Sequence, residues 1–180
     1  MPTPPLTPRP TATLFAGRVH VAYMQLYVMS GSGFATDPDQ ANKGQVNGLC
    51  GAAVPGMLFL TTGLHTGATH LTIEQYDEEP ALDDAWEEIV EVSFRPDDEL
   101  VSLVEWAGQA SYPFLLPVQY YRVRYCATGM DAASAADVVT GDEPPLDRYL
   151  LQLWPDFPQP DRIRRQTADV AAYWHQAWRD

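Results

Sequence analysis

The chain has 180 residues and a formal net charge of −13, from 24 acidic against 11 basic residues. Its length suits one domain whose core needs no disulfide or metal, and 46% hydrophobic residues with 11% aromatics are typical of a folded protein. A chain this acidic is repelled by phosphate backbones, which argues against direct nucleic-acid binding. The acids therefore indicate either a basic partner or a simple contribution to solubility.

The first 13 residues are rich in proline and predict a disordered leader, followed by a single domain over residues 14–180. The leader lacks the apolar core of a secretory signal, and the longest apolar runs are too short to span a bilayer. We therefore expect a cytoplasmic protein without membrane contact. Cys50 and Cys126 are expected to be buried thiols, with a disulfide between them left open because both fall in predicted strands.

The first half of the chain predicts short strands. Residues 18–29 form one long β-type run with apolar side chains on both faces, which is typical of a strand that is covered on both sides or lies centrally in a sheet. A polar loop follows at residues 30–44. Residues 57–63 and 70–76 predict two further strands, and residues 64–69 between them have the length of a hairpin connection.

The second half predicts strands of alternating pattern. One face of the strand at 119–127 holds Arg122 and Arg124, which we expect to meet water, and the strand at 87–94 is expected to be half-buried. The predicted strands are 87–94, 99–106, 119–127 and 148–155. The predicted connections are 77–86, as a loop or one helical turn, 108–114, and 129–145 with a short helical piece.

The segment from residue 160 onward has a helical pattern. Asp161 can cap a helix, and residues 166–178 predict one that packs an aromatic stripe on the sheets. The residues at helical spacing are Ile163, Val170, Tyr173, Trp174 and Trp178. The chain as a whole predicts a mainly β fold, an antiparallel β-sandwich of about seven to nine strands with a C-terminal α-helix. A closed barrel is the alternative.

His65 and His70 stand five residues apart across a glycine-containing turn. Metal-binding histidines sit two apart on a strand face or three to four apart on a helix, so we expect no metal site unless a hairpin brings the two opposite each other. The sequence contains no P-loop, nucleophile elbow, G-x-G-x-x-G or H-E-x-x-H. We accordingly predict no cofactor and no catalytic residue.

Half of the acids lie between Glu74 and Glu99, where Arg95 is the only basic residue. Glu74 and Glu91 lie in predicted strands and could oppose each other as an acid/base pair, although outward-facing glutamates are also usual on a solvated sheet. An alternative function is therefore a β-sandwich that binds a small molecule or carbohydrate, or hydrolyses one, at a site around His70 and Glu74. Tryptophans would line such a pocket.

Three strands resemble the competence protein J family, small bacterial proteins described as inhibitors of a DNA-entry nuclease. The shared pattern is a tyrosine-x-glutamine strand, a valine-rich strand, and a Leu-Pro…Tyr strand; its residues here are Tyr23, Gln25, Phe94, Leu116, Pro117 and Tyr121. Residues 149–160 and the tryptophan helix depart from that pattern. The family offers no catalytic motif, so no residue role follows from the resemblance.

The resemblance implies a protein that blocks the basic groove of a nuclease by offering carboxylates in place of DNA phosphates. The leading hypothesis is thus a non-enzymatic protein-interaction module of inhibitor or immunity type with a basic protein partner. The expected contact residues are Asp77, Glu78, Glu79, Asp83, Asp84, Glu87 and Glu88.

Overall fold

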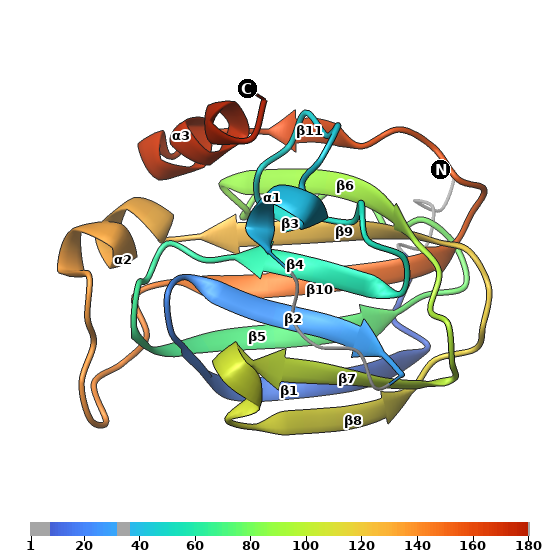
Figure 1. Ribbon diagram of the computed structural model, residues 1–180, viewed down its shortest axis with the longest axis horizontal. Helices are drawn as coiled ribbons and strands as arrows, with labels where there is room; N and C mark the ends of the chain where they lie inside the picture. The colour runs from blue at the N-terminus through green and yellow to red at the C-terminus, as the bar shows by residue number, and fades with distance from the viewer. Residues whose placement is uncertain (1–7, 32–36, 180) are drawn as a thin grey trace, which may run out of the picture.

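The computed structural model describes residues 8–31 and 37–179, and these form a sandwich of two β-sheets with short helices at its rim (Figure 1). The predicted mainly β sandwich with a C-terminal helix is confirmed, with 11 strands in the described residues rather than seven to nine. The alternative of a closed barrel does not occur in this part of the chain. Of the predicted leader, residues 1–7 lie outside the described residues, and the first strand begins at Ala12.

The six-stranded sheet has the order β1-β5-β10-β9-β6-β11. Its neighbours pair antiparallel except β5 and β10, which are parallel. The strands are β1 (Ala12–Val21), β5 (Gly67–Gln75), β6 (Glu88–Phe94), β9 (Tyr121–Thr128), β10 (Arg148–Pro155) and β11 (Arg162–Arg165).

The five-stranded sheet is antiparallel and has the order β3-β4-β2-β7-β8. Its strands are β2 (Gln25–Ser30), β3 (Cys50–Gly51), β4 (Met57–Thr61), β7 (Leu100–Glu105) and β8 (Ser111–Leu115). The helices are α1 (Pro38–Ala41), α2 (Met130–Ala136) and α3 (Asp169–Ala177), with a 3₁₀ turn at Trp106–Gly108.

The core lies between the two sheets, because every second residue of each strand points to the facing sheet. On β9 this places Val123 and Tyr125 inside, in the same core cluster as Leu58 and Leu60 of β4. The Tyr125 hydroxyl donates to the Thr61 carbonyl at 3.1 Å, which satisfies a polar group that burial would otherwise penalise. Cys50 and Cys126 are buried free thiols, as expected.

One predicted strand and one predicted connection were wrong. The run at 18–29 is broken by a tight turn in which Tyr23 and Met24 have positive φ (55° and 60°), so that β1 enters one sheet and β2 the other. The predicted hairpin at 64–69 is a crossover, because β4 and β5 lie in different sheets. Alternation of side chains identifies a strand and its two faces, but it does not identify the sheet in which the strand pairs.

The C-terminal prediction needs three corrections. A strand, β11, precedes the helix, which begins at Asp169 rather than at 166. Asp161 caps no helix and instead accepts the backbone N–H groups of Val46 and Asn47 at 2.9 and 2.8 Å. The aromatic stripe is only partly buried, since Tyr173 is 61% exposed.

The connector expected at 108–114 instead contains most of the edge strand β8 (Ser111–Leu115), where Pro113 is tolerated because an edge strand pairs on one side only. The expected connection at 77–86 is confirmed as a loop. No helix in the described ranges has the length and apolarity needed to cross a membrane.

Candidate functional site

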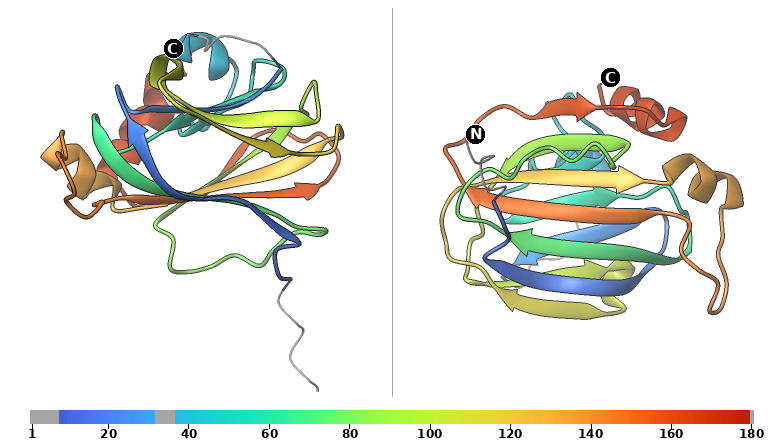
Figure 2. Two further views of the ribbon diagram at one scale, coloured as in Figure 1. Left: turned by 90° about the horizontal axis from the view of Figure 1, so that it is seen from below. Right: turned by 180° about the vertical axis from the view of Figure 1, so that it is seen from behind.

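The acidic segment 76–87 connects β5 to β6 across the outer face of the six-stranded sheet, the face turned away from the five-stranded sheet. Since β10 and β9 lie between β5 and β6, the segment must cross both strands. Figure 2 (left) shows it as the green loop on the far side of the sheet from the rest of the sandwich. Six of the seven contact residues expected from sequence thus lie in a loop above a sheet face rather than at the end of the sandwich.

A polar row crosses the sheet beneath this loop. Strand register places Glu74, Gln152, Arg124, Glu91 and Arg162 side by side on five successive strands, from β5 to β11. Side chains at directly paired positions lie within contact distance of one another. The row therefore brings together strands that are up to 88 residues apart in the sequence, from residue 74 to residue 162.

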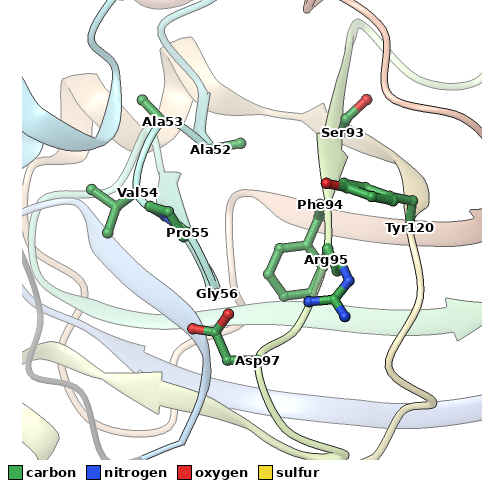
Figure 3. Close-up of a pocket in the computed structure, with 10 residues that line it drawn as sticks. All are labelled: Ala52, Ala53, Val54, Pro55, Gly56, Ser93, Phe94, Arg95, Asp97 and Tyr120. Carbon is green, nitrogen blue, oxygen red and sulfur yellow. The ribbon is translucent and has the colours of Figure 1, made fainter.

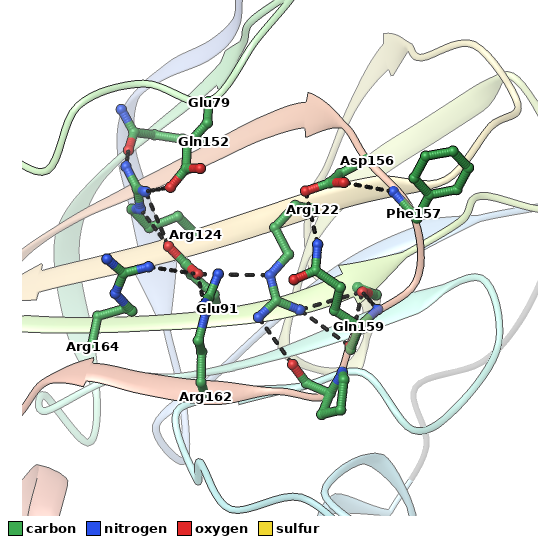
Figure 4. Close-up of polar contacts among 12 residues, drawn as sticks. Glu79, Glu91, Arg122, Arg124, Gln152, Asp156, Phe157, Gln159, Arg162 and Arg164 are labelled. Carbon is green, nitrogen blue, oxygen red and sulfur yellow. Dashed lines mark hydrogen bonds and ion pairs between the residues drawn. The ribbon is translucent and has the colours of Figure 1, made fainter.

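Glu91 is the centre of this row, and its side chain is fully buried. Its two oxygens accept from Arg162 Nε at 2.7 Å and Arg124 Nε at 3.0 Å, as Figure 4 shows. Arg164 Nη1 lies 3.5 Å away and Arg122 Nε 3.7 Å away. Burial disfavours the charge of Glu91, but the hydrogen bonds from Arg162 and Arg124 outweigh it and hold the pKa of Glu91 below its usual value.

Arg122 and Arg124 were predicted to face water, and this is wrong: both are buried. The strand of Glu91 was predicted to be half-buried, and it too is covered on both faces. The reason is that chain segments distant in sequence cover the outer face. Arg122 donates to the carbonyls of Gln159 at 3.2 Å and Pro160 at 3.0 Å, in the segment between β10 and β11.

Arg124 also holds the first half of the acidic loop. Its Nη1 donates to the Pro80 carbonyl at 2.8 Å, and its Nη2 pairs with Glu79 at 2.9 Å. The guanidinium lies over the Trp154 ring, 5.0 Å from its centroid. The loop therefore has a fixed path on the sheet.

The second half of the loop is held by Arg165, whose Nη1 donates to the Trp86 carbonyl at 2.7 Å and whose Nη2 donates to Asp84 at 2.6 Å. Glu88 follows the end of the loop, and its carboxylate accepts the backbone N–H groups of Thr167 and Ala168, just before α3. Burial raises the pKa of Glu88, while these two hydrogen bonds oppose that rise.

The expected contact residues fall into three groups. Asp77 and Glu78 are exposed and make no ion pair with any residue in the described ranges. Other acids are exposed but engaged: the Glu79 side chain is 51% exposed and that of Asp84 is 96% exposed, each paired with an arginine. Asp83 and Glu87 are exposed and accept the backbone N–H groups of Ala85 and Gly129, whereas Glu88 is buried and offers nothing to a partner.

The other sequence candidates do not meet in one place. Glu74 and Glu91 are separated by Gln152 and Arg124 in the row, so they cannot act as an acid/base pair across a substrate. Glu74 accepts the Tyr76 hydroxyl at 2.7 Å. Among the described residues no group of three or more histidine, cysteine or acidic side chains lies close enough together to hold a metal ion.

The two histidines have different surroundings. His65 lies against the Tyr23 ring, with ring centroids 5.3 Å apart, and its Nδ1 is 2.9 Å from the Thr66 hydroxyl. His70 is exposed on the outer face, between Arg18 and Arg148. Since β4 and β5 do not form a hairpin, nothing brings the two histidines opposite each other.

A small hollow of about 260 Å³ lies between residues 52–56 and the end of β6 (Figure 3). Phe94 lies in its wall, Arg95 and Asp97 supply its charges, and the Arg95 guanidinium is 5.9 Å from the Tyr120 ring centroid. It contains none of the predicted site residues. The arginine cluster around Glu91 was not predicted from the sequence either. Two arginines on the same face of one strand, Arg122 and Arg124, in so acidic a chain could have indicated that this face carries buried ion pairs.

The structure defines a class: a two-sheet β-sandwich in which long connections cover one outer face. No family model matches the sequence, and no curated protein matches it. Among solved structures, the chain is similar to ComJ of Bacillus subtilis, described as an inhibitor of the DNA-degrading activity of NucA. The TM-score is 0.54 at 13% identity over 81% of this chain and 98% of that chain.

A second similar structure is described as crocagin biosynthetic gene J, with a TM-score of 0.53 and 14% identity over 81% of this chain and 98% of that chain. At these identities the likeness concerns the fold alone. The resemblance to the competence protein J family expected from sequence is thereby confirmed at the level of the fold.

Proposed function

We propose that the protein is a non-enzymatic interaction module of inhibitor type, which binds a basic protein, in the first place a nuclease, through the acidic loop at 76–87. The observation that supports this most is the fixed path of the loop, held by Arg124 and Arg165 while its carboxylates stay exposed. The fold supports it as well, since the similar ComJ is described as a nuclease inhibitor.

A nuclease presents a basic groove to DNA phosphates, and fixed carboxylates can take the place of those phosphates. Because the loop is already ordered on the sheet, little conformational entropy is lost on binding. Exposed acids also steer a basic partner toward the surface, which raises the association rate at low salt. Asp77, Glu78 and Asp84 are the residues we assign to the contact, with Glu79, Asp83 and Glu87 beside them. Glu88 is left out because it is buried.

We place this complex in the cytoplasm, where Cys50 and Cys126 would remain reduced. Both thiols are buried, and burial raises the pKa of Cys126 to about 12, so neither is suited to nucleophilic chemistry. This supports a binding role for the protein. The inhibitor is proposed to act on the nuclease and not on DNA, since a net charge of −13 opposes contact with phosphate.

The test is a DNA-degradation assay with purified protein. A labelled duplex is digested by an extract of the native host and, separately, by purified NucA of Bacillus subtilis, while the protein is titrated in. We expect the host activity to fall, and a complex with the responsible nuclease to elute together in size-exclusion chromatography. No loss of either activity at a large excess of protein, with no complex, would show the proposal to be wrong.

A charge-matched pair of variants locates the contact. Asp77→Asn with Glu78→Gln removes two charges from the loop, and Asp98→Asn with Glu99→Gln removes two from the connection between β6 and β7. Asn at 98 can still accept the Leu100 N–H that Asp98 accepts at 2.9 Å. We expect the first pair to weaken inhibition about three- to tenfold at low salt and the second to change it little. Equal weakening by both pairs would refute the assignment of the loop.

A further inference from the structure

Three basic side chains stand in a row on the outer face of the six-stranded sheet, away from Asp77 and Glu78. Register pairs Arg18 of β1 with His70 of β5, and His70 with Arg148 of β10. All three are exposed. Directly paired side chains start close together, so the two arginines stand on either side of His70.

Neither arginine of this row is neutralised. Arg18 Nη2 donates to the Glu143 carbonyl at 3.2 Å, and the Arg148 guanidinium lies over the Trp86 ring, 5.0 Å from its centroid. Within residues 8–31 and 37–179, neither makes an ion pair, whereas the arginines around Glu91 do. The two arginine charges stand on either side of β5 and repel each other, and an anion between them would remove that repulsion.

The row lines a hollow of about 470 Å³, a size typical of sites for small molecules. Pro145 and Leu146 form an apolar wall, and Leu146 is 47% exposed. Glu87 lines the hollow as well, but its carboxylate already accepts the Gly129 N–H at 3.0 Å.

Asp147 is the second acid at this hollow, and it too is engaged. It is buried, and it accepts the Thr69 hydroxyl at 2.7 Å, the Tyr149 hydroxyl at 2.5 Å and the Leu64 N–H at 3.2 Å. The remaining donors of Arg18 and Arg148 are therefore open to a ligand, and the exposed His70 ring lies beside them.

We propose that this hollow is a binding site for a small molecule that carries a phosphate or carboxylate group and an apolar part. The anionic group lies between Arg18 and Arg148 beside His70, because a guanidinium fork matches the oxygens of either anion. The apolar part lies on Pro145 and Leu146. Trp86 and the Glu143 carbonyl hold the two arginines in place before the ligand arrives, which lowers the entropic cost of binding.

The test is an NMR titration of the ¹⁵N-labelled protein at constant ionic strength. The probes are phenyl phosphate, inorganic phosphate, benzoate and the neutral benzyl alcohol. The Gly129 amide reports on the proposed site, and the Gly56 amide reports on the hollow near Arg95. We expect saturable shifts at Gly129 with phenyl phosphate or benzoate, and none at Gly56. The two probes decide between a phosphate and a carboxylate ligand, and inorganic phosphate shows what the anionic group contributes alone.

Three variants complete the test. Each charge-assisted hydrogen bond is worth enough that Arg18→Met and Arg148→Met should each weaken binding about tenfold or more. Arg95→Met removes the same charge from another surface and should leave binding unchanged. Absence of saturable binding by both anionic aromatic probes, equal binding of benzyl alcohol, or equal weakening by Arg95→Met would overturn the proposal. These outcomes are independent of nuclease inhibition, which Arg18→Met should leave intact.

Discussion

Replacing Glu91 by glutamine should destabilise the protein strongly, because it removes the one buried negative charge at the centre of the arginine cluster. Arg122 and Arg124 are both buried; Arg122 would lose the acidic side chain it pairs with, and Arg124 would keep only the half-exposed Glu79. Removing one partner of a buried ion pair costs about 3–5 kcal/mol, which is a large share of the roughly 5–15 kcal/mol that typically stabilises a domain. We therefore expect Glu91→Gln to lower the free energy of unfolding by at least about 3 kcal/mol.

Urea unfolding followed by far-ultraviolet circular dichroism measures this loss. The matched control is Glu74→Gln, in the same row but partly exposed, where the carboxylate accepts the Tyr76 hydroxyl at 2.7 Å. That change should cost about 1 kcal/mol or less. If the free energy of unfolding of Glu91→Gln lies within about 1 kcal/mol of the wild-type value, or equals that of Glu74→Gln, the arginine cluster does not stabilise the fold through Glu91.

The cost of Glu91→Gln should also depend on pH. The pKa of Glu91 is lower in the folded protein than in the unfolded chain, so its charge stabilises the fold fully above the ordinary value of 4.5. As the pH falls through the lowered pKa, Glu91 is protonated in both states and the contribution disappears. The difference between wild type and variant should accordingly shrink in acid. Glu88, whose pKa is raised, is common to both proteins and cancels in the difference.

Three further predictions concern other parts of the fold. Gly48→Ala should destabilise by about 1–3 kcal/mol or more in urea unfolding, because its Cβ would lie 2.0 Å from the Trp174 carbonyl oxygen; unchanged stability would contradict this packing. Cys50 and Cys126 should react with a thiol reagent at pH 8 only after unfolding, since burial raises both pKa values. Burial lowers the pKa of His175 to about 4 from 6.5, so wild-type stability should fall by up to about 3 kcal/mol as the pH drops from 6.5 to 4, and His175→Gln should flatten that dependence.

Local sequence patterns predicted the strands and helices better than they predicted which strands pair with each other. The strand expected at 148–155 is β10 with the same bounds, and the small-residue segment after residue 129 does contain a short helix, α2. These elements are specified by residues close in sequence, such as a β-rich run ended by Pro155. The turn at Tyr23 and Met24 lacks the glycine or asparagine that usually marks positive φ, so the sequence gives no sign that one long run is two strands.

The site depended on contacts that no local pattern contains. Alternation correctly places Arg122 and Arg124 on the face opposite the core, but only the crossing of two distant segments makes that face dry. The acidic loop was found from its composition alone, while the distinction between exposed Asp77 and buried Glu88 required the register of β6 and the position of α3. A run of charged residues in a sequence indicates an exposed segment, but the fold determines which of those side chains are exposed.

The segment from Pro160 onward has a consequence for synthesis of the chain on the ribosome. The Pro160 carbonyl accepts from buried Arg122, and Arg162 supplies the shortest contact to Glu91, at 2.7 Å. Earlier strands can pair as they emerge, and Glu91 can pair with Arg124, but Arg122 lacks its carbonyl acceptors and Glu91 lacks Arg162 until this segment has been made. The part of the outer face around Arg122 therefore stays hydrated in the nascent chain, and its closing is an event that follows translation of residue 165.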